Sequence, residues 1–113
     1  MRAKLRGYDD TYLDWTVYNV GLPGLCIHRA PSRGGHALDC WTVSHLVSGY
    51  RVVTGLPSAC AALRVAKRLA RLANWNVPES ELNRKKLGQR RHAQIVRLIR
   101  TLERGKVRGE EIR

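Results

Sequence analysis

The hydrophobic pattern of this chain changes its period at one place, the turn-forming segment Gly55-Leu56-Pro57. Upstream, apolar and polar residues alternate over residues 12–18, which is the period of a half-buried strand. Downstream, apolar residues recur at helical spacing over residues 59–73, with cations on the opposite side. Strands followed by helices around one core predict an α+β domain.

The strongest local prediction is a hairpin over residues 40–54. Runs rich in β-branched and aromatic residues lie on both sides of Ser48-Gly49, which suits a two-residue primed turn. The register set by this turn pairs Val43 with Thr54. It predicts a core face made of Trp41, Val43, His45, Val47, Tyr50 and Val52, and an opposite face made of Ser44, Leu46, Arg51 and Val53.

Shorter signals predict the rest of the sheet and the first helix. A strand over residues 12–18 and a short strand over residues 25–28 extend the hairpin to an antiparallel sheet of three to four strands. Ser58 is expected to cap an Ala-rich amphipathic helix. Because its apolar side consists mostly of small residues, this helix is expected to pack closely across the hairpin.

The segment 79–104 has the composition of a second, basic helix. Asn76 is expected to cap it, with Glu79 closing a capping box. Gly88 lies inside the segment, and because glycine costs about 1 kcal/mol against alanine in a helix, a kink or break is expected there. Residues 105–113 carry little apolar content and are expected to fray.

At 113 residues the chain is expected to be a single domain, 1–113, without internal repeats. It divides into a β-rich half over residues 1–55 and a basic helical half over residues 56–104, followed by the tail. The expected fold class is α+β: a small antiparallel β-sheet packed by an amphipathic helix and followed by a basic C-terminal helix or broken helix.

Positive charge is concentrated in the second half of the chain. Residues 1–55 carry six Lys or Arg and four Asp or Glu, a net charge of +2, whereas residues 56–113 carry fifteen Lys or Arg and five Glu, a net charge of +10. A field of this sign attracts polyanions, and nucleic acid is the commonest of them, ahead of acidic proteins and anionic membranes. Solubility alone is the alternative use of such charge.

Two groups of cations carry the prediction of a nucleic-acid partner. The first lies opposite the apolar side of the first helix, where a solvated helix face is the alternative explanation. The second packs five cations into eight residues without an acid between them, and because like charges one turn apart destabilise a helix, this density indicates an anionic partner. The expected phosphate-binding residues are Arg64, Lys67, Arg68 and Arg71 in the first group, and Arg84, Lys85, Lys86, Arg90 and Arg91 in the second.

Other reactive side chains predict structure rather than chemistry. Cys26, His28, His36 and Cys40 offer two thiols and two imidazoles, a ligand set that zinc accepts. A Cys-x2-Cys knuckle is absent, and buried cysteines and surface histidines explain the same residues, so no metal or cofactor is predicted. His45 is expected to be a hydrogen-bonded core histidine. No nucleophile elbow, phosphate loop or paired carboxylates accompany these residues, so the sequence predicts a binding protein and not an enzyme.

The sequence also predicts where the protein resides. No apolar segment follows the basic start, and no apolar run approaches the roughly 18 residues that span a bilayer. Three irregularly spaced cysteines are typical of reduced thiols. These features predict a cytoplasmic protein without a membrane partner.

One apolar stripe in the second helix has two alternative uses. Its residues are Ile95, Leu98, Ile99 and Leu102. If the stripe is exposed, it predicts a homodimer or partner interface. If it is buried, it simply packs on the sheet.

The run from Trp41 to Val53, followed by the Ala-rich helix to Trp75, resembles a pattern in small phage and mobile-element proteins. These carry a W-x-V-x-H-x-x-S-G hairpin and then a helix. The resemblance covers about a third of the chain and implies either nucleic-acid handling or interference with a host machine. The second option would make the protein an anti-CRISPR-like inhibitor of a host nucleoprotein, such as a CRISPR effector or an RNA polymerase.

Overall fold

The computed structural model describes residues 1–6, 12–19, 21–32 and 37–107. Within these ranges the chain forms strands β1 (Arg2–Arg6), β2 (Tyr12–Thr16), β3 (Leu25–Pro31), β4 (Ala37–His45) and β5 (Arg51–Leu56). Helices follow as α1 (Ala59–Ala70), the 3-10 turn η1 (Glu79–Leu82), α2 (Arg84–Leu87) and α3 (Gln89–Val107). The predicted α+β class is confirmed.

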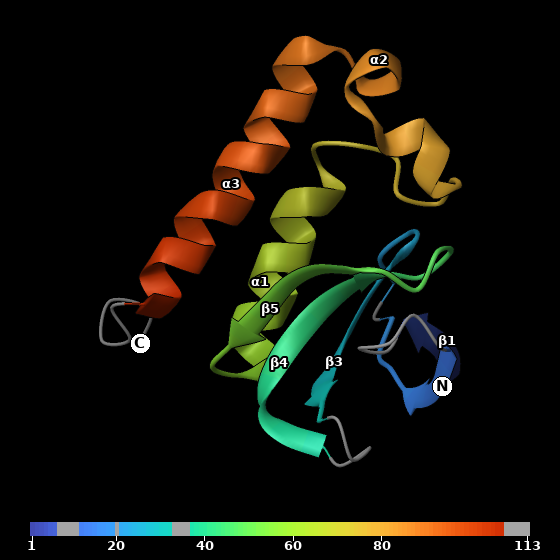
Figure 1. Cartoon of the computed structure of the whole chain (residues 1–113), viewed down its shortest axis with the longest axis vertical. Coiled ribbons are helices and arrows are strands. Elements are labelled where there is room, and N and C mark those ends of the chain that lie inside the picture. Colours follow the sequence, from blue (N-terminus) through green and yellow to red (C-terminus); the bar gives the residue numbers. More distant parts are fainter. Residues whose placement is uncertain (7–11, 20, 33–36, 108–113) are drawn as a thin grey trace.

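Strands β3, β4 and β5 form an antiparallel sheet in that order, and helices pack on it from one side. Helix α1 lies across the sheet, and α3 runs beside α1 and contacts β5 (Figure 1). Ser58 caps α1 as predicted, because its hydroxyl accepts a hydrogen bond from the Ala61 amide at 3.1 Å. The first helix therefore starts where the sequence placed it.

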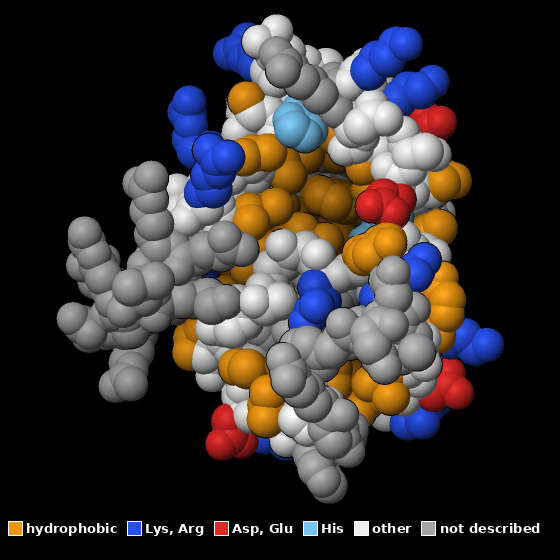
Figure 2. Space-filling model, in the orientation of Figure 1, with side chains coloured by type: hydrophobic (Ala, Val, Ile, Leu, Met, Phe, Trp, Pro, Cys, Tyr) orange, Lys and Arg blue, Asp and Glu red, His pale blue; other side chains and the backbone are white. Residues whose placement is uncertain are grey.

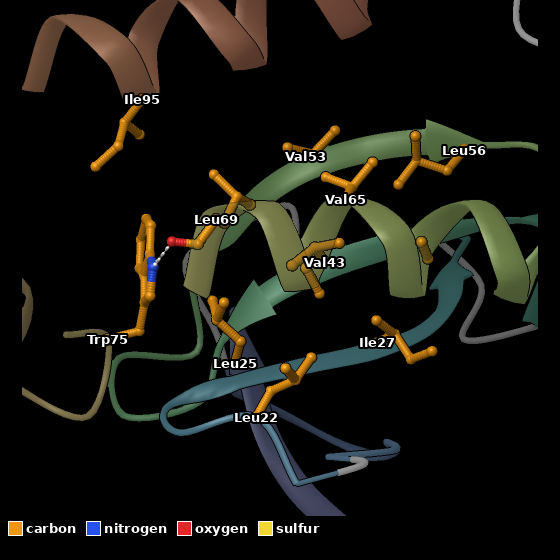
Figure 3. Close-up of a cluster of buried hydrophobic side chains, with 12 residues drawn as sticks. Leu22, Leu25, Ile27, Val43, Val53, Leu56, Val65, Leu69, Trp75 and Ile95 are labelled. Atoms are coloured by element: carbon orange, nitrogen blue, oxygen red, sulfur yellow. Dashed lines mark hydrogen bonds between the residues drawn. The ribbon is translucent and has the colours of Figure 1, made fainter. Parts of the chain in front are cut away.

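The main core lies between this sheet and the helices. Side chains of Val43 and Val53 from the sheet face Val65 and Leu69 of α1, as Figure 3 shows. Trp75 closes one end of the core, where its indole N–H donates a hydrogen bond to the Leu69 carbonyl at 2.7 Å. A buried indole with its polar atom satisfied anchors the segment after α1 to the end of that helix.

A second, two-stranded sheet covers the other face, and the sequence did not predict it. Strand β1 pairs with β2 in antiparallel register, joining Arg2 to Thr16 and Leu5 to Leu13. A small second core forms where buried Leu5 and Val17 meet Cys26 of β3. Residues 2–6 do alternate cationic and apolar side chains, which is the period of a half-buried strand, but the run is only five residues long and contains only Ala3 and Leu5 as apolar residues.

The hairpin prediction is confirmed, but its register is wrong. The loop between β4 and β5 spans residues 46–50, and the β4–β5 pairing contains two irregularities that each place an extra residue on β5, so Val43 pairs with Val53 instead of Thr54. Val53 is therefore buried in the core, whereas Val47 and Tyr50 are exposed. A shift of one residue turns a side chain to the other face, and here the shift in β5 brings Val53 into the core, whereas Val43 and His45 of β4 are buried as predicted.

His45 explains why the loop is longer than a two-residue turn. Its Nε2 lies 2.8 Å from the Trp75 carbonyl, which can only accept, so Nε2 carries the proton. Its Nδ1 then accepts from the Ser48 hydroxyl at 2.7 Å, while that hydroxyl oxygen accepts from the Tyr50 amide. The histidine is 2% exposed and ties the loop to a residue thirty positions away. The predicted structural role is what the geometry shows.

The basic second half is broken where glycine was expected to break it. Gly88 has a φ of +87°, a left-handed conformation that other residues rarely adopt, and it separates α2 from α3. The cap prediction is wrong, because Pro78 precedes η1 without a side-chain cap, and Asn83 caps α2 through the Lys86 amide at 2.9 Å. Helix α3 continues to Val107, and residues 108–113 of the predicted tail lie outside the described residues.

Candidate nucleic-acid interface

The first predicted group of cations forms one stripe on α1. The residues on the opposite side, including Ala62 and Leu69, are buried against the sheet. We name the stripe the α1 stripe; its members are all exposed and are Arg64, Lys67, Arg68 and Arg71. Cations in the last helical turn also interact favourably with the helix dipole, so Lys67 and Arg68 have a structural use as well.

The α1 stripe borders a groove between α1 and α3. Arg68, Arg71 and Leu72 line one wall, and Gln94 and Leu98 of α3 line the other, around a volume of about 310 Å³. Two guanidinium groups beside a glutamine amide present several N–H donors to one space. Arginine forks match phosphate oxygens in pairs, so this groove suits a phosphate better than a neutral group.

The second predicted group gathers around the reversal at Gly88. Lys85 and Lys86 are exposed on α2, and Arg90 and Arg91 are exposed on the first turn of α3. We name these four the α2–α3 cluster; the side chain of Arg84 is not described. Figure 1 places α2 and the start of α3 together at one end of the molecule, beyond the C-terminal end of α1. Figure 2 shows Lys and Arg side chains along this end and the α3 flank, around a hollow floored by hydrophobic side chains.

No carboxylate neutralises these cations among the residues whose side chains are described. The salt bridge found there joins Arg29 to Asp39 at 3.3 Å, away from the helices. Glu79 and Glu81 of η1 are exposed and lie beyond salt-bridge distance of the described helix cations. Within the described part of the chain, the α1 stripe and the α2–α3 cluster thus present positive charge that no carboxylate pairs with.

Sequence reasoning missed two further arginines on α3. Arg97 and Arg100 line a second hollow of about 490 Å³ together with Gln89, His92 and Thr101. Their spacing of three residues, opposite the apolar stripe of the same helix, is the signal by which the sequence could have shown them as one surface. The basic character of α3 therefore extends well past the α2–α3 cluster.

The apolar stripe of α3 is used inside the chain. Ile95 is buried, and Leu98, Ile99 and Leu102 are half-buried against the main core. Of the two alternatives that the sequence left open, the structure shows packing inside the domain.

Two of the four residues considered as a zinc ligand set, Cys26 and His28, make hydrogen bonds inside the protein. The imidazole of His28 uses both nitrogens: Nδ1–H donates to the Arg29 carbonyl at 2.8 Å, and Nε2 accepts from the Ser44 hydroxyl at 2.7 Å. Cys26 is buried, its thiol donates to the Ser44 carbonyl at 3.7 Å, and burial raises its pKa to about 11. Among the described residues no group of three metal-ligating side chains occurs, and His36 lies outside them.

The buried His28 makes stability depend on pH. Burial, together with the nearby Arg51 charge, holds the pKa of His28 below its ordinary value of 6.5, and the Arg29 carbonyl only partly offsets this. The unfolded chain therefore takes up a proton at higher pH than the folded chain. We expect the free energy of unfolding to fall as pH decreases below about 6.5, by at most about 1.4 kcal/mol per pH unit from this group.

Urea unfolding between pH 7.5 and pH 5 measures this slope in the wild-type protein and in His28→Gln. The variant is expected to be less stable at every pH, because Ser44 loses its partner, but to lose the slope that His28 contributes. The same slope in both proteins would assign the pH dependence to another group.

In the part of the chain that the structure describes, no helix combines the length and apolar character needed to cross a membrane.

Comparison with known proteins adds no assignment to this geometry. The sequence matches no known family model, and no curated protein or solved structure is significantly similar to it.

Proposed function

We propose that this protein is a non-enzymatic nucleic-acid-binding protein that contacts phosphates through the α1 stripe and the α2–α3 cluster. The observation that carries the proposal is the uncompensated charge: eight predicted cations have described, exposed side chains, and none of them has a carboxylate partner among the described residues. Arginines predominate among them, which favours phosphate oxygens.

The groove between α1 and α3 adds geometry to the charge. It brings Arg68 and Arg71 beside a second helix, so a phosphate there meets donors from two elements instead of one solvated helix face. Two helices that share one basic groove can follow a nucleic-acid backbone over more than one phosphate. This supports contact with the backbone and carries no argument for reading a particular base sequence.

Salt dependence tests the proposal directly. If six or more phosphates are contacted, we expect affinity between 50 and 200 mM salt to fall by about 10³-fold or more for a duplex and by about 300-fold or more for a single strand. Fluorescence anisotropy with labelled oligonucleotides measures it. Binding that ignores salt, or no binding to any nucleic acid, would refute the proposal.

The alternative is an inhibitor that docks on a host nucleoprotein complex, such as a CRISPR effector or an RNA polymerase. The same basic surface would then occupy an acidic patch or the edge of a nucleic-acid channel. A pull-down after complete nuclease digestion separates the two. Retention of one host complex in high salt would favour the inhibitor, whereas loss of all bound material on digestion favours nucleic acid.

A further inference from the structure

A third open pocket is lined by residues of the strands and contains none of the helix cations. It encloses about 660 Å³, within the size range of small-molecule sites. Its walls come from β1, β2, the segment after β2, β3 and β4. The aromatic residues lining it are Trp15, Tyr18 and Trp41, and the cationic ones are Arg2 and Arg29.

The aromatic rings in this pocket are held in place yet left accessible. The indole N–H of Trp15 donates to the Arg29 carbonyl at 2.9 Å, which fixes that ring. Tyr18 and Trp41 form a tilted pair, with ring centroids 6.1 Å apart and planes at 42°. Tyr18 nevertheless remains 50% exposed, so much of a large aromatic ring faces solvent. Trp15 and Trp41 are half-buried, so Tyr18 offers the most exposed ring, and rings ordered in advance provide a stacking surface at low entropic cost.

The pocket is connected to the start of α1 through the sheet register. Trp41 pairs with Arg29 on one side and with Leu56 on the other, and α1 begins three residues after Leu56. The groove at Arg68 and Arg71 lies toward the other end of this helix, which is 12 residues or about 18 Å long. The pocket therefore lies near the N-terminal end of α1 and the groove near its C-terminal end.

The charges in the pocket decide what kind of planar ligand it takes. Arg2 donates to the Thr16 hydroxyl at 3.2 Å, which keeps its guanidinium beside the aromatic rings. Arg29 pairs with Asp39 at 3.3 Å, but both side chains are well exposed, and such pairs exchange readily with other anions. Two guanidinium groups repel a cationic ligand, so an aromatic cage for an ammonium group does not fit.

We infer that this pocket binds an unpaired nucleobase of a single-stranded nucleic acid, with the base stacked on Tyr18 or Trp41 and the flanking phosphate beside Arg2 and Arg29. The inference rests on the proposed function and adds to it a preference for single strands. Bases of every kind have a flat π-face, so stacking predicts no strong sequence preference. A paired base inside a duplex cannot reach the pocket.

Tryptophan emission of the unmodified protein provides the first test. Trp75 is buried, so an added oligothymidylate of about ten nucleotides is expected to quench Trp15 and Trp41 selectively. A duplex of equal length is expected to bind without this quenching. The Trp41→Phe variant should lose a large share of the signal. Single-strand binding without any change in emission would overturn the inference.

Affinity measurements on variants provide the second test. Tyr18→Ala is expected to weaken oligothymidylate binding by about five- to a hundredfold, and to leave duplex affinity unchanged. Tyr12→Ala is the matched control, because Tyr12 is a similarly exposed tyrosine that contacts Arg6 outside the pocket. Equal effects of the two variants would overturn the inference. Tryptophan quenching by a proline-rich peptide, without quenching by oligothymidylate, would also overturn it.

The outcomes separate this inference from the proposed function. If Tyr18→Ala binds single strands normally while loss of the α1 stripe weakens binding, the pocket assignment fails and the basic interface stands. If the pocket variants alone weaken binding, the assignment of the interface to the helices fails and the pocket stands.

Discussion

Replacing all four cations of the α1 stripe by glutamine is expected to lower affinity for a DNA duplex by about a thousandfold near 100 mM salt. Each phosphate contact that is lost removes about 0.9 from the slope of log K against log salt concentration, so four contacts remove between 3 and 4. The variant is Arg64→Gln, Lys67→Gln, Arg68→Gln and Arg71→Gln combined. Anisotropy titrations at several salt concentrations measure both quantities.

The matched control keeps the charge and changes the donor geometry. Arg64→Lys, Arg68→Lys and Arg71→Lys together preserve four cations on the same exposed face, so the salt slope should stay unchanged and affinity should fall only a few-fold. Because the stripe is exposed, both variants are expected to fold, which thermal unfolding verifies. Wild-type affinity in the glutamine variant would remove α1 from the interface and leave the α2–α3 cluster as the remaining candidate.

Gly24→Ala is expected to destabilise the protein by about 3 kcal/mol or more. Gly24 has a φ of +73°, and a Cβ there would lie 2.1 Å from the carbonyl carbon and oxygen of Trp75. The left-handed backbone alone costs about 1–2 kcal/mol for a residue with a side chain, and the overlap with a fixed backbone adds to it. Against a typical total of 5–15 kcal/mol, the loss is a large fraction of stability.

Gly21→Ala separates the two causes of this loss. Gly21 has a similar φ of +77°, but no atom lies within 4 Å of the position its Cβ would take. We expect it to cost about 1–2 kcal/mol, the conformational part alone. Urea unfolding of both variants measures the difference, and equal losses would mean that the contact between Gly24 and Trp75 does not form.

The Gly24–Trp75 contact belongs to a junction that holds three distant segments together. The Leu46 amide donates to the Gly24 carbonyl at 2.8 Å, and His45 donates to the Trp75 carbonyl. The turn before β3, the hairpin loop and the segment after α1 therefore share one set of backbone contacts. Because the three segments share these hydrogen bonds, we expect Gly24→Ala to lower the stability of the whole hairpin and not only of the turn before β3.

Local signals in the sequence determined where elements begin and end. Ser58 capped α1, Gly88 separated α2 from α3, and the change of period after Leu56 marked the passage from sheet to helices. These features depend on interactions between residues a few positions apart, so the sequence alone displays them. The uneven distribution of charge is likewise a property of the chain itself.

Only the tertiary structure decided which segments meet. Strand β1 became a strand by pairing with β2, the hairpin register followed from His45 reaching Trp75, and the aromatic pocket collects residues from four strands and the segment after β2. These contacts bring together separate segments of the chain and gain their energy from burial that exists only in the folded chain. No pattern of neighbouring residues carries that energy, and for this reason the sequence could not display these contacts.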